Sequence, residues 1–144
     1  ELALGFEEEK SEESKKTLLE GKKILLVEDN ELNMEIAEFM LENQKGTVVK
    51  AWNGQEAVDI YAKSKDGEFD LILMDIMMPI MNGIEASKQI RCFERKDSKT
   101  IPIVAMSANT FHDDRQKGID AGVNAYIPKP VDEEKLVKIL RKYI

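Results

Sequence analysis

The fold is decided by the stretch Phe69-Asp70-Leu71-Ile72-Leu73-Met74-Asp75-Ile76-Met77-Met78-Pro79. Residues 71–74 form a continuous apolar run with an acid at each end, which is typical of a strand buried on both faces of a parallel sheet. Such a strand brings Asp75 to the carboxyl edge of the sheet, where open α/β folds keep their ligand sites. Pro79 and the pair Asn82-Gly83 then predict a turn into a helix.

Further apolar runs predict strands on either side of this one, at residues 23–27, 47–51, 101–106 and 125–127. Helical patterns separate the strands, over residues 31 to about 44, 54 to about 66, 83 to about 95 and 111–122, and a last helix follows residue 132. Strands that alternate with helices are expected to make right-handed crossovers. The sequence therefore predicts an α/β fold with one parallel sheet covered by helices on both faces.

Local signals define the ends and faces of these helices. The apolar positions of the first helix recur at helical spacing, namely Leu32, Ile36, Phe39 and Met40. Asn53 is expected to cap the second helix, with Glu56 as its reciprocal partner. Asp132 is expected to cap the last helix.

The helix that ends near Gly122 is the weakest in the chain. It has few apolar anchors besides Phe111 and Ile119, and Gly118 lies inside it. Because glycine lowers helix stability and few side chains hold the segment in place, we expect its packing to shift easily.

Composition excludes several classes of protein. A net charge of −7 with no basic stripe argues against nucleic-acid binding. The single Cys92 excludes an intramolecular disulfide and fits a reducing compartment. No run approaches the ~20 apolar residues of a membrane span, and no signal peptide opens the chain. We therefore expect a soluble, cytoplasmic protein, with a charged linker or tail at residues 1–21 and one domain at 22–144.

Polar side chains follow four of the predicted strands. They are Glu28 and Asp29, Asp75, Ser107 and Lys129. Carboxylates without His or Cys favour a hard cation, Mg²⁺ before Zn²⁺, and Mg²⁺ prefers phosphate oxygens among its remaining ligands. A lysine and a hydroxyl complement a phosphoryl group, and a carboxylate is the natural nucleophile. This edge therefore predicts a site for phosphoryl transfer through an aspartyl phosphate.

Motifs at the same positions carry a family resemblance. They are Ile24-Leu25-Leu26-Val27-Glu28-Asp29-Asn30, Leu73-Met74-Asp75-Ile76-Met77-Met78-Pro79-x-Met81-x-Gly83, Ala105-Met106-Ser107-Ala108 and Lys129-Pro130. Over residues 22–144 the chain resembles the receiver domain of two-component response regulators. The resemblance implies a flavodoxin-like (βα)5 doubly wound sheet with strand order 2-1-3-4-5.

The resemblance also implies a role for each residue. Asp75 is expected to be the phosphoacceptor, and Asp29 and Asp75 to bind Mg²⁺ together with the backbone carbonyl of Met77. Glu28, where an Asp is often found, is expected to act on the metal through a water. The phosphoryl oxygens are expected to contact Ser107 and Lys129. The resemblance also implies that Tyr126 is the switch aromatic and that the Lys129-Pro130 bond is cis.

The opening of the chain resembles a subtype of this family. Residues 2–6, an acidic linker and then Gly21-Lys22-Lys23-Ile24 are similar to the join between the ATP-binding domain and the C-terminal receiver of hybrid sensor kinases. A kinase core is then expected before residue 1, in the cytoplasmic part of a membrane-bound sensor. The expected partners are a histidine kinase or a histidine phosphotransfer domain, and a weak homodimer is a further expectation. Partners are expected to bind the helix before Gly122, the fifth strand and the last helix.

Other functions share parts of this pattern. A flavodoxin-like flavin binder has the same architecture, but Glu28 and Asp29 would repel its phosphate. An aspartyl-phosphate phosphatase of the haloacid type shares the chemistry, but its general acid stands two residues after the nucleophile, where this chain has Met77. A degenerate receiver that serves only for docking is a third alternative, and the intact set of acids with Lys129 argues against it.

Overall fold

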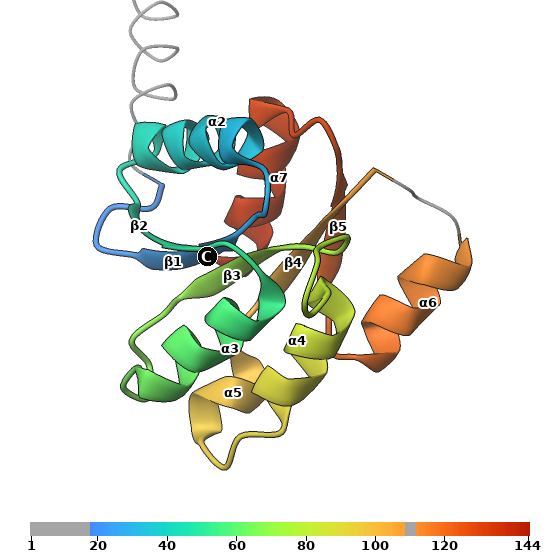
Figure 1. Ribbon diagram of the computed structural model, residues 1–144. Coiled ribbons are helices and arrows are strands. Elements are labelled where there is room, and N and C mark those ends of the chain that lie inside the picture. Colours follow the sequence, from blue (N-terminus) through green and yellow to red (C-terminus); the bar gives the residue numbers. More distant parts are fainter. Residues whose placement is uncertain (1–17, 109–111) are drawn as a thin grey trace, which may run out of the picture.

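The computed structural model describes residues 18–108 and 112–144, apart from the side chains of residues 112–115. A parallel sheet of five strands forms its middle layer, in the order β2-β1-β3-β4-β5. Helices α2 and α7 lie on one side of the sheet, and α3, α4 and α5 lie on the other (Figure 1). The predicted fold class and strand order are therefore confirmed.

Strands and helices alternate along the chain. The strands are β1 (Lys23–Val27), β2 (Thr47–Ala51), β3 (Leu71–Asp75), β4 (Ile103–Ser107) and β5 (Ala125–Pro128). The helices are α2 (Glu31–Asn43), α3 (Gly54–Lys63), α4 (Gly83–Arg91), α5 (Lys96–Thr100), α6 (His112–Asp120) and α7 (Glu133–Tyr143).

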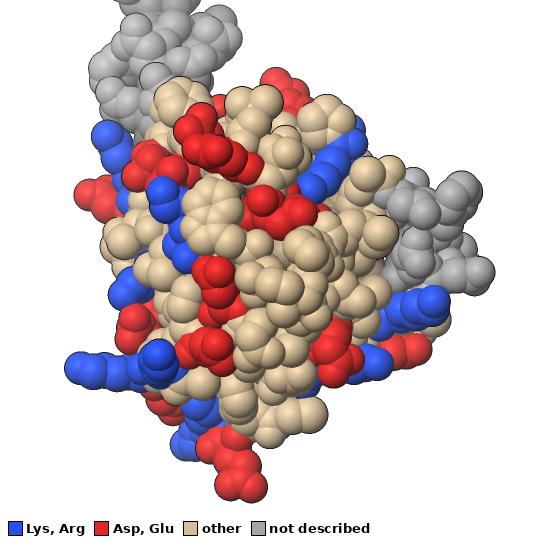
Figure 2. Space-filling view, viewed as in Figure 1, with Lys and Arg blue, Asp and Glu red and all other residues tan. Residues whose placement is uncertain are grey.

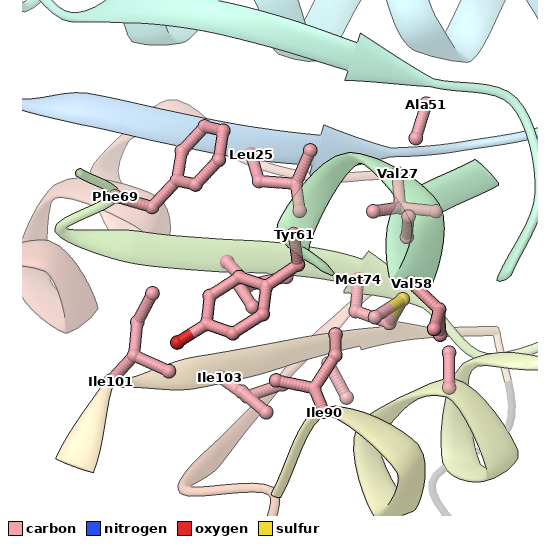
Figure 3. Packing of buried hydrophobic residues seen from close by; sticks show 14 of the residues in the cluster. Leu25, Val27, Ala51, Val58, Tyr61, Phe69, Met74, Ile90, Ile101 and Ile103 are labelled. Atoms are coloured by element: carbon pink, nitrogen blue, oxygen red, sulfur yellow. The ribbon is translucent and has the colours of Figure 1, made fainter. Parts of the chain in front are cut away.

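The sheet separates two apolar cores, because successive side chains of a strand point to opposite faces. The core beneath α3 and α4 contains Leu25, Val27, Ile72, Met74, Tyr61 and Ile90 (Figure 3). The core beneath α2 and α7 contains Ile24, Leu26, Leu71, Leu73, Met34 and Leu136. Every residue of β3 is buried. Since burying one such side chain contributes about 1.5–3 kcal/mol, the strand gives Asp75 a rigid base.

The segment after β3 differs from the prediction. A single helix was expected from residue 83 to about 95, but α4 ends at Arg91 and the short helix α5 follows. Arg95 explains the break, because its guanidinium donates to the backbone carbonyls of Tyr61, Ser64 and Lys65. These partners lie about thirty residues away in the sequence, so local helical spacing does not reveal them.

Helix α2 presents a different face to the sheet from the one predicted. The buried residues are Met34, Ala37 and Leu41. Three of the expected core positions are exposed, Leu32 by 64%, Ile36 by 43% and Phe39 by 67%. Both sets fit the helical period, and the small Ala37 allows the helix to approach the sheet closely.

The folded unit begins before the predicted boundary at residue 22. Leu19, which the sequence assigns to the linker, is fully buried. Its N–H donates to the carbonyl of Gln44 at 2.9 Å, and its side chain packs against Gly46. The part of the expected tail that precedes residue 18 lies outside the described residues.

The helix caps agree with the sequence in part. Asn53 Oδ1 accepts from Glu56 N at 2.9 Å, as expected. Glu56 returns the contact through its Oε2, which accepts from Asn53 Nδ2 at 3.4 Å, while its Oε1 accepts from Trp52 N at 3.2 Å. Asp132 stands at the N-cap of α7 but makes no side-chain hydrogen bond there. Its contribution is therefore its charge near the positive end of the helix dipole.

Helix α6 lacks one of its two predicted anchors. Ile119 is 59% exposed, so it does not hold the helix on the sheet. Phe111, the other expected anchor, lies outside the described residues.

Candidate functional site

The carboxyl ends of four strands bring the predicted site residues to one edge of the sheet. Glu28 follows β1, Asp75 ends β3, Ser107 ends β4, and Lys129 follows β5. The strand register places the ends of β3 and β4 side by side, because Asp75 of β3 pairs with Met106 of β4. Parallel pairing of β4 with β5 then places residue 107 opposite residue 128.

Lys129 joins two of the acids across this edge. Its Nζ lies 2.8 Å from Glu28 Oε2 and 3.1 Å from Asp75 Oδ1. The side chains of Glu28 and Asp75 are 1% and 2% exposed, so both ion pairs are shielded from water. The peptide bond between Lys129 and Pro130 is cis, as expected.

The two carboxylate oxygens of Asp75 have different surroundings. Oδ1 accepts from Met77 N at 3.3 Å and faces Lys129. Oδ2 is buried and has no hydrogen-bond partner among the described residues. Burying an acceptor without a hydrogen-bond partner costs free energy of folding. This oxygen is therefore suited to bind an electron-poor ligand.

The acids at this edge fit a hard cation. One carboxylate oxygen each from Glu28, Asp29 and Asp75 lies within 4.8 Å of the others. Asp29 is exposed whereas the other two are buried, so the cluster opens to solvent on its side. Oxygen ligands alone, with one open side, favour Mg²⁺ over zinc.

Burial and charge change the acidity of two of these groups. The pKa of Asp75 is raised from 3.8 to about 7, chiefly by burial and then by the charge of Glu28, against the opposing effect of Lys129. For Lys129, burial lowers the pKa, but hydrogen bonding to Glu28 and the charge of Asp75 leave it above its ordinary value. A cation among the carboxylates would favour the ionised form of Asp75.

Backbone contacts hold the first acidic segment in place. Glu28 N donates to the carbonyl of Ala51 at 3.1 Å, which extends the β1–β2 pairing by one residue. Glu28 Oε1 accepts from Asn30 N at 3.2 Å, and Asn30 caps α2 by accepting from Asn33 N. Asn30 therefore caps α2 through its side chain and holds the turn that carries Asp29 through its backbone N–H.

Gly83 allows α4 to start directly against the site, a role that is not among those predicted above from the sequence. A Cβ at this position would lie 2.8 Å from Met74 Cγ and closer still to the carbonyl oxygen of Asp75. The N–H of Gly83 donates to the carbonyl of Ile76 at 3.0 Å. A glycine at the start of a predicted helix, next to Asn82, was the signal for this close approach.

The remaining predicted residues lie around this centre. Ser107 is 5% exposed, and its carbonyl accepts from Lys129 N at 3.0 Å. Tyr126 is partly buried against the core beneath α4. Met77 contributes its N–H to Asp75, while its side chain is 75% exposed.

The family model of the response regulator receiver domain matches residues 24–141 of this chain. The chain is a response regulator receiver domain. It is 35% identical over 124 residues to the hybrid signal transduction histidine kinase I of Dictyostelium discoideum, a match that covers 85% of this chain and 7% of the kinase. The receiver domain thus spans a small part of the relatives that it resembles.

Solved structures of other receiver domains share the fold. The receiver domain of a sensor histidine kinase from Pseudomonas aeruginosa PAO1, with a magnesium ion in its active site cleft, is 34% identical with a TM-score of 0.76, and the match covers 85% and 96% of the two chains. A co-crystal structure of the Saccharomyces cerevisiae histidine phosphotransfer protein Ypd1 with the receiver domain of the response regulator Ssk1 matches at 37% identity and a TM-score of 0.76, covering 85% and 88%.

Within residues 18–108 and 112–144, no helix has both the length and the apolar character that crossing a bilayer requires.

Proposed function

We propose that this receiver domain takes a phosphoryl group from a phosphohistidine onto Asp75, with Mg²⁺ as cofactor. The observation that carries the proposal is Asp75 Oδ2, a buried carboxylate oxygen without a hydrogen-bond partner among the described residues, beside Lys129. Such an oxygen is free to act as a nucleophile, and the lysine supplies a positive charge next to it.

Asp29 and Asp75 would hold the Mg²⁺ ion together with the carbonyl of Met77, and Glu28 would act through a water. The magnesium-bearing receiver domain from P. aeruginosa supports this assignment, as does the clustering of the three acids. When bound, Mg²⁺ neutralises charge on the phosphoryl oxygens and on the acids around it.

The transfer exchanges one bond for another. An oxygen of Asp75 forms a bond to phosphorus, the bond from phosphorus to the histidine nitrogen breaks, and its electron pair stays on the imidazole. Asp75 must be ionised for this attack, and Lys129 favours that form through its charge. Lys129 and Ser107 are assigned to the phosphoryl oxygens, where an ammonium and a hydroxyl both donate.

The partner that we propose is a histidine kinase or a histidine phosphotransfer domain. The co-crystal of Ypd1 with the Ssk1 receiver domain supports the second kind, and the hybrid kinase from D. discoideum supports the first. We further propose that this domain belongs to a hybrid kinase. A cytoplasmic location is part of the proposal and is supported by a chain with a single cysteine.

Phosphorylation is proposed to change the surface near α6. New phosphoryl oxygens at Asp75 would attract the hydroxyl of Ser107, and Tyr126 would turn toward the space that is left. Helix α6 is suited to a second arrangement because its apolar Ile119 is exposed rather than packed on the sheet.

A small phosphodonor tests the phosphoacceptor directly. Phosphoramidate with Mg²⁺ should add one phosphoryl group to the parent, measured as intact mass, and none to Asp75→Asn. Asp59→Asn is the matched control, because Asp59 is an exposed acid of α3 that bonds only to Gln55 among the described residues. An adduct that survives in Asp75→Asn would refute the assignment. Sustained turnover of small phosphate esters would favour the phosphatase alternative.

A further inference from the structure

Ile80 has a backbone conformation that isoleucine rarely adopts. It lies in the loop between β3 and α4 with a φ of 71°. The N–H of Met81 donates to the carbonyl of Pro79 at 2.8 Å, which makes Ile80 the central residue of a three-residue turn. A β-branched residue with positive φ is strained, and glycine or asparagine would fit this turn better.

Packing within the domain does not explain the choice of isoleucine either. The Ile80 side chain is 82% exposed, more than any other exposed large apolar residue among those the structure describes. Met77, three residues earlier in the same loop, is 75% exposed. An isoleucine that is unfavourable for the turn and contributes little to the core is best explained by a contact outside this chain.

The loop that carries Ile80 directly follows Asp75 and is anchored at both ends. Its start is tied to the site, because Met77 N donates to Asp75 Oδ1. Its end is tied by the carbonyl of Met81, which accepts from Gly54 N at 3.0 Å, and by Gly83 N, which donates to Ile76. The side chain of Ile80 is therefore presented from an anchored turn.

A protein that delivers a phosphoryl group must cover the rim of this site. Asp75 is 2% exposed, so a short imidazole side chain reaches it only when the donor's surface rests on the surrounding residues. Ile80 and Met77 are exposed apolar residues of the loop that leads from Asp75 to α4. On the α2 side, Ile36 lines a cavity of about 50 Å³ that Lys129 also lines. The surface over the β3–α4 loop is uncharged and lies beside acidic side chains (Figure 2).

We infer that Ile80 is a recognition residue for the protein that donates the phosphoryl group. The inference rests on the proposed function. Ile80 contacts an apolar patch on the surface of the phosphohistidine-bearing donor and takes no part in the chemistry at Asp75. Substitutions of Ile80 therefore change transfer from a protein donor and leave phosphorylation by small donors intact.

The test compares two phosphodonors on the same set of variants. The protein donor is phosphorylated yeast Ypd1, and the small donor is phosphoramidate, both with Mg²⁺. Ile80→Asn removes the apolar contact and suits a positive φ, whereas Ile80→Leu keeps an apolar side chain. Asp59→Asn, at an exposed position of α3 outside the expected partner surface, serves as the control.

We expect Ile80→Asn to lower the rate of transfer from phospho-Ypd1 about tenfold, which is the effect of losing one apolar anchor at an interface. Its rate with phosphoramidate should stay within about twofold of the parent rate, and its melting temperature should rise because the turn is relieved. Ile80→Leu should keep most of the transfer, and Asp59→Asn should match the parent with both donors.

Two results would overturn the inference. One is equal transfer from phospho-Ypd1 to the parent and to Ile80→Asn. The other is a parent that phosphoramidate phosphorylates and phospho-Ypd1 does not. If phosphoramidate fails to phosphorylate the parent at all, the proposed function fails, and the inference fails with it.

Discussion

The phenol ring of Tyr126 lies directly against Gly118 of α6. A Cβ added to Gly118 would lie 2.6 Å from Tyr126 Cζ and closer still to the hydroxyl oxygen. The absence of a side chain at position 118 therefore gives Tyr126 its place between α6 and the sheet. This accounts for a glycine inside a helix, where alanine would be more stable by about 1 kcal/mol.

Gly118→Ala should expel the Tyr126 ring from this place. In the parent background we expect the substitution to lower the free energy of unfolding by about 1–2 kcal/mol, since the ring loses its packing. In a Tyr126→Ala background, the same substitution should raise the free energy of unfolding by up to about 1 kcal/mol, through helix propensity alone. Urea unfolding of the four proteins measures the difference. Equal effects in the two backgrounds would show that the residues are not coupled.

Asp75 should make stability fall as the pH rises. Its pKa is raised from 3.8 to about 7, so the folded state retains a proton that the unfolded state has already lost. The contribution of this retained proton to the free energy of unfolding is present in full below pH 4 and is lost as the pH rises through 7. Without Mg²⁺, Asp75→Asn should be more stable than the parent at pH 8 by on the order of 2 kcal/mol, with a smaller difference at pH 5. Thermal unfolding at both pH values tests this, and parallel curves would contradict it.

The sequence predicted the strands, and the meeting of their polar end residues at one edge of the sheet, for a physical reason. β3 is apolar throughout and buried on both faces, so its pattern has only one interpretation, and its last residue must reach the edge of the sheet. The same reasoning applied to β1 and β5 brought Glu28 and Lys129 to that edge, where they form an ion pair of 2.8 Å. In a parallel sheet the carboxyl ends of the strands lie at one edge, so residues that follow different strands in the sequence become neighbours in the fold.

Features that depend on distant partners were not predictable. Helix α2 has apolar residues on two faces, and only the position of the sheet decides that Leu41 is buried and Phe39 exposed. The break before α5 depends on contacts of Arg95 with carbonyls about thirty residues away. The strain at Ile80 was equally hidden, because nothing in its residue type indicates a positive φ.

Arg95 should contribute to stability without affecting the site. Its side chain is paired with Asp97 at 2.7 Å, stacks 4.4 Å from the centre of the Tyr61 ring, and donates to backbone carbonyls of the segment after α3. Arg95→Ala removes the ion pair, the ring contact and these hydrogen bonds together, so we expect the free energy of unfolding to fall by about 2–4 kcal/mol. Arg141→Ala, at an exposed position of α7, should have little effect. Rates of phosphorylation by phosphoramidate, measured well below the melting temperature, should be unchanged. A slower rate in Arg95→Ala would instead link this cluster to the phosphorylation site.

Mg²⁺ binding should depend on Asp29, and Trp52 should report it. Trp52 is the only tryptophan of the chain and directly follows Ala51, whose carbonyl accepts from Glu28 N. Its indole is 38% exposed, so a cation among the neighbouring acids should change its fluorescence. Asp29→Ala removes one ligand and also relieves repulsion among the acids. We therefore expect a folded variant, at least as stable as the parent, whose fluorescence no longer responds to millimolar Mg²⁺.

Asp59→Ala, in the middle of α3, should titrate like the parent. Equal Mg²⁺ affinity in Asp29→Ala and the parent would place the ion elsewhere, because a site that keeps its affinity without its one exposed acid cannot be the cluster formed with Glu28 and Asp75.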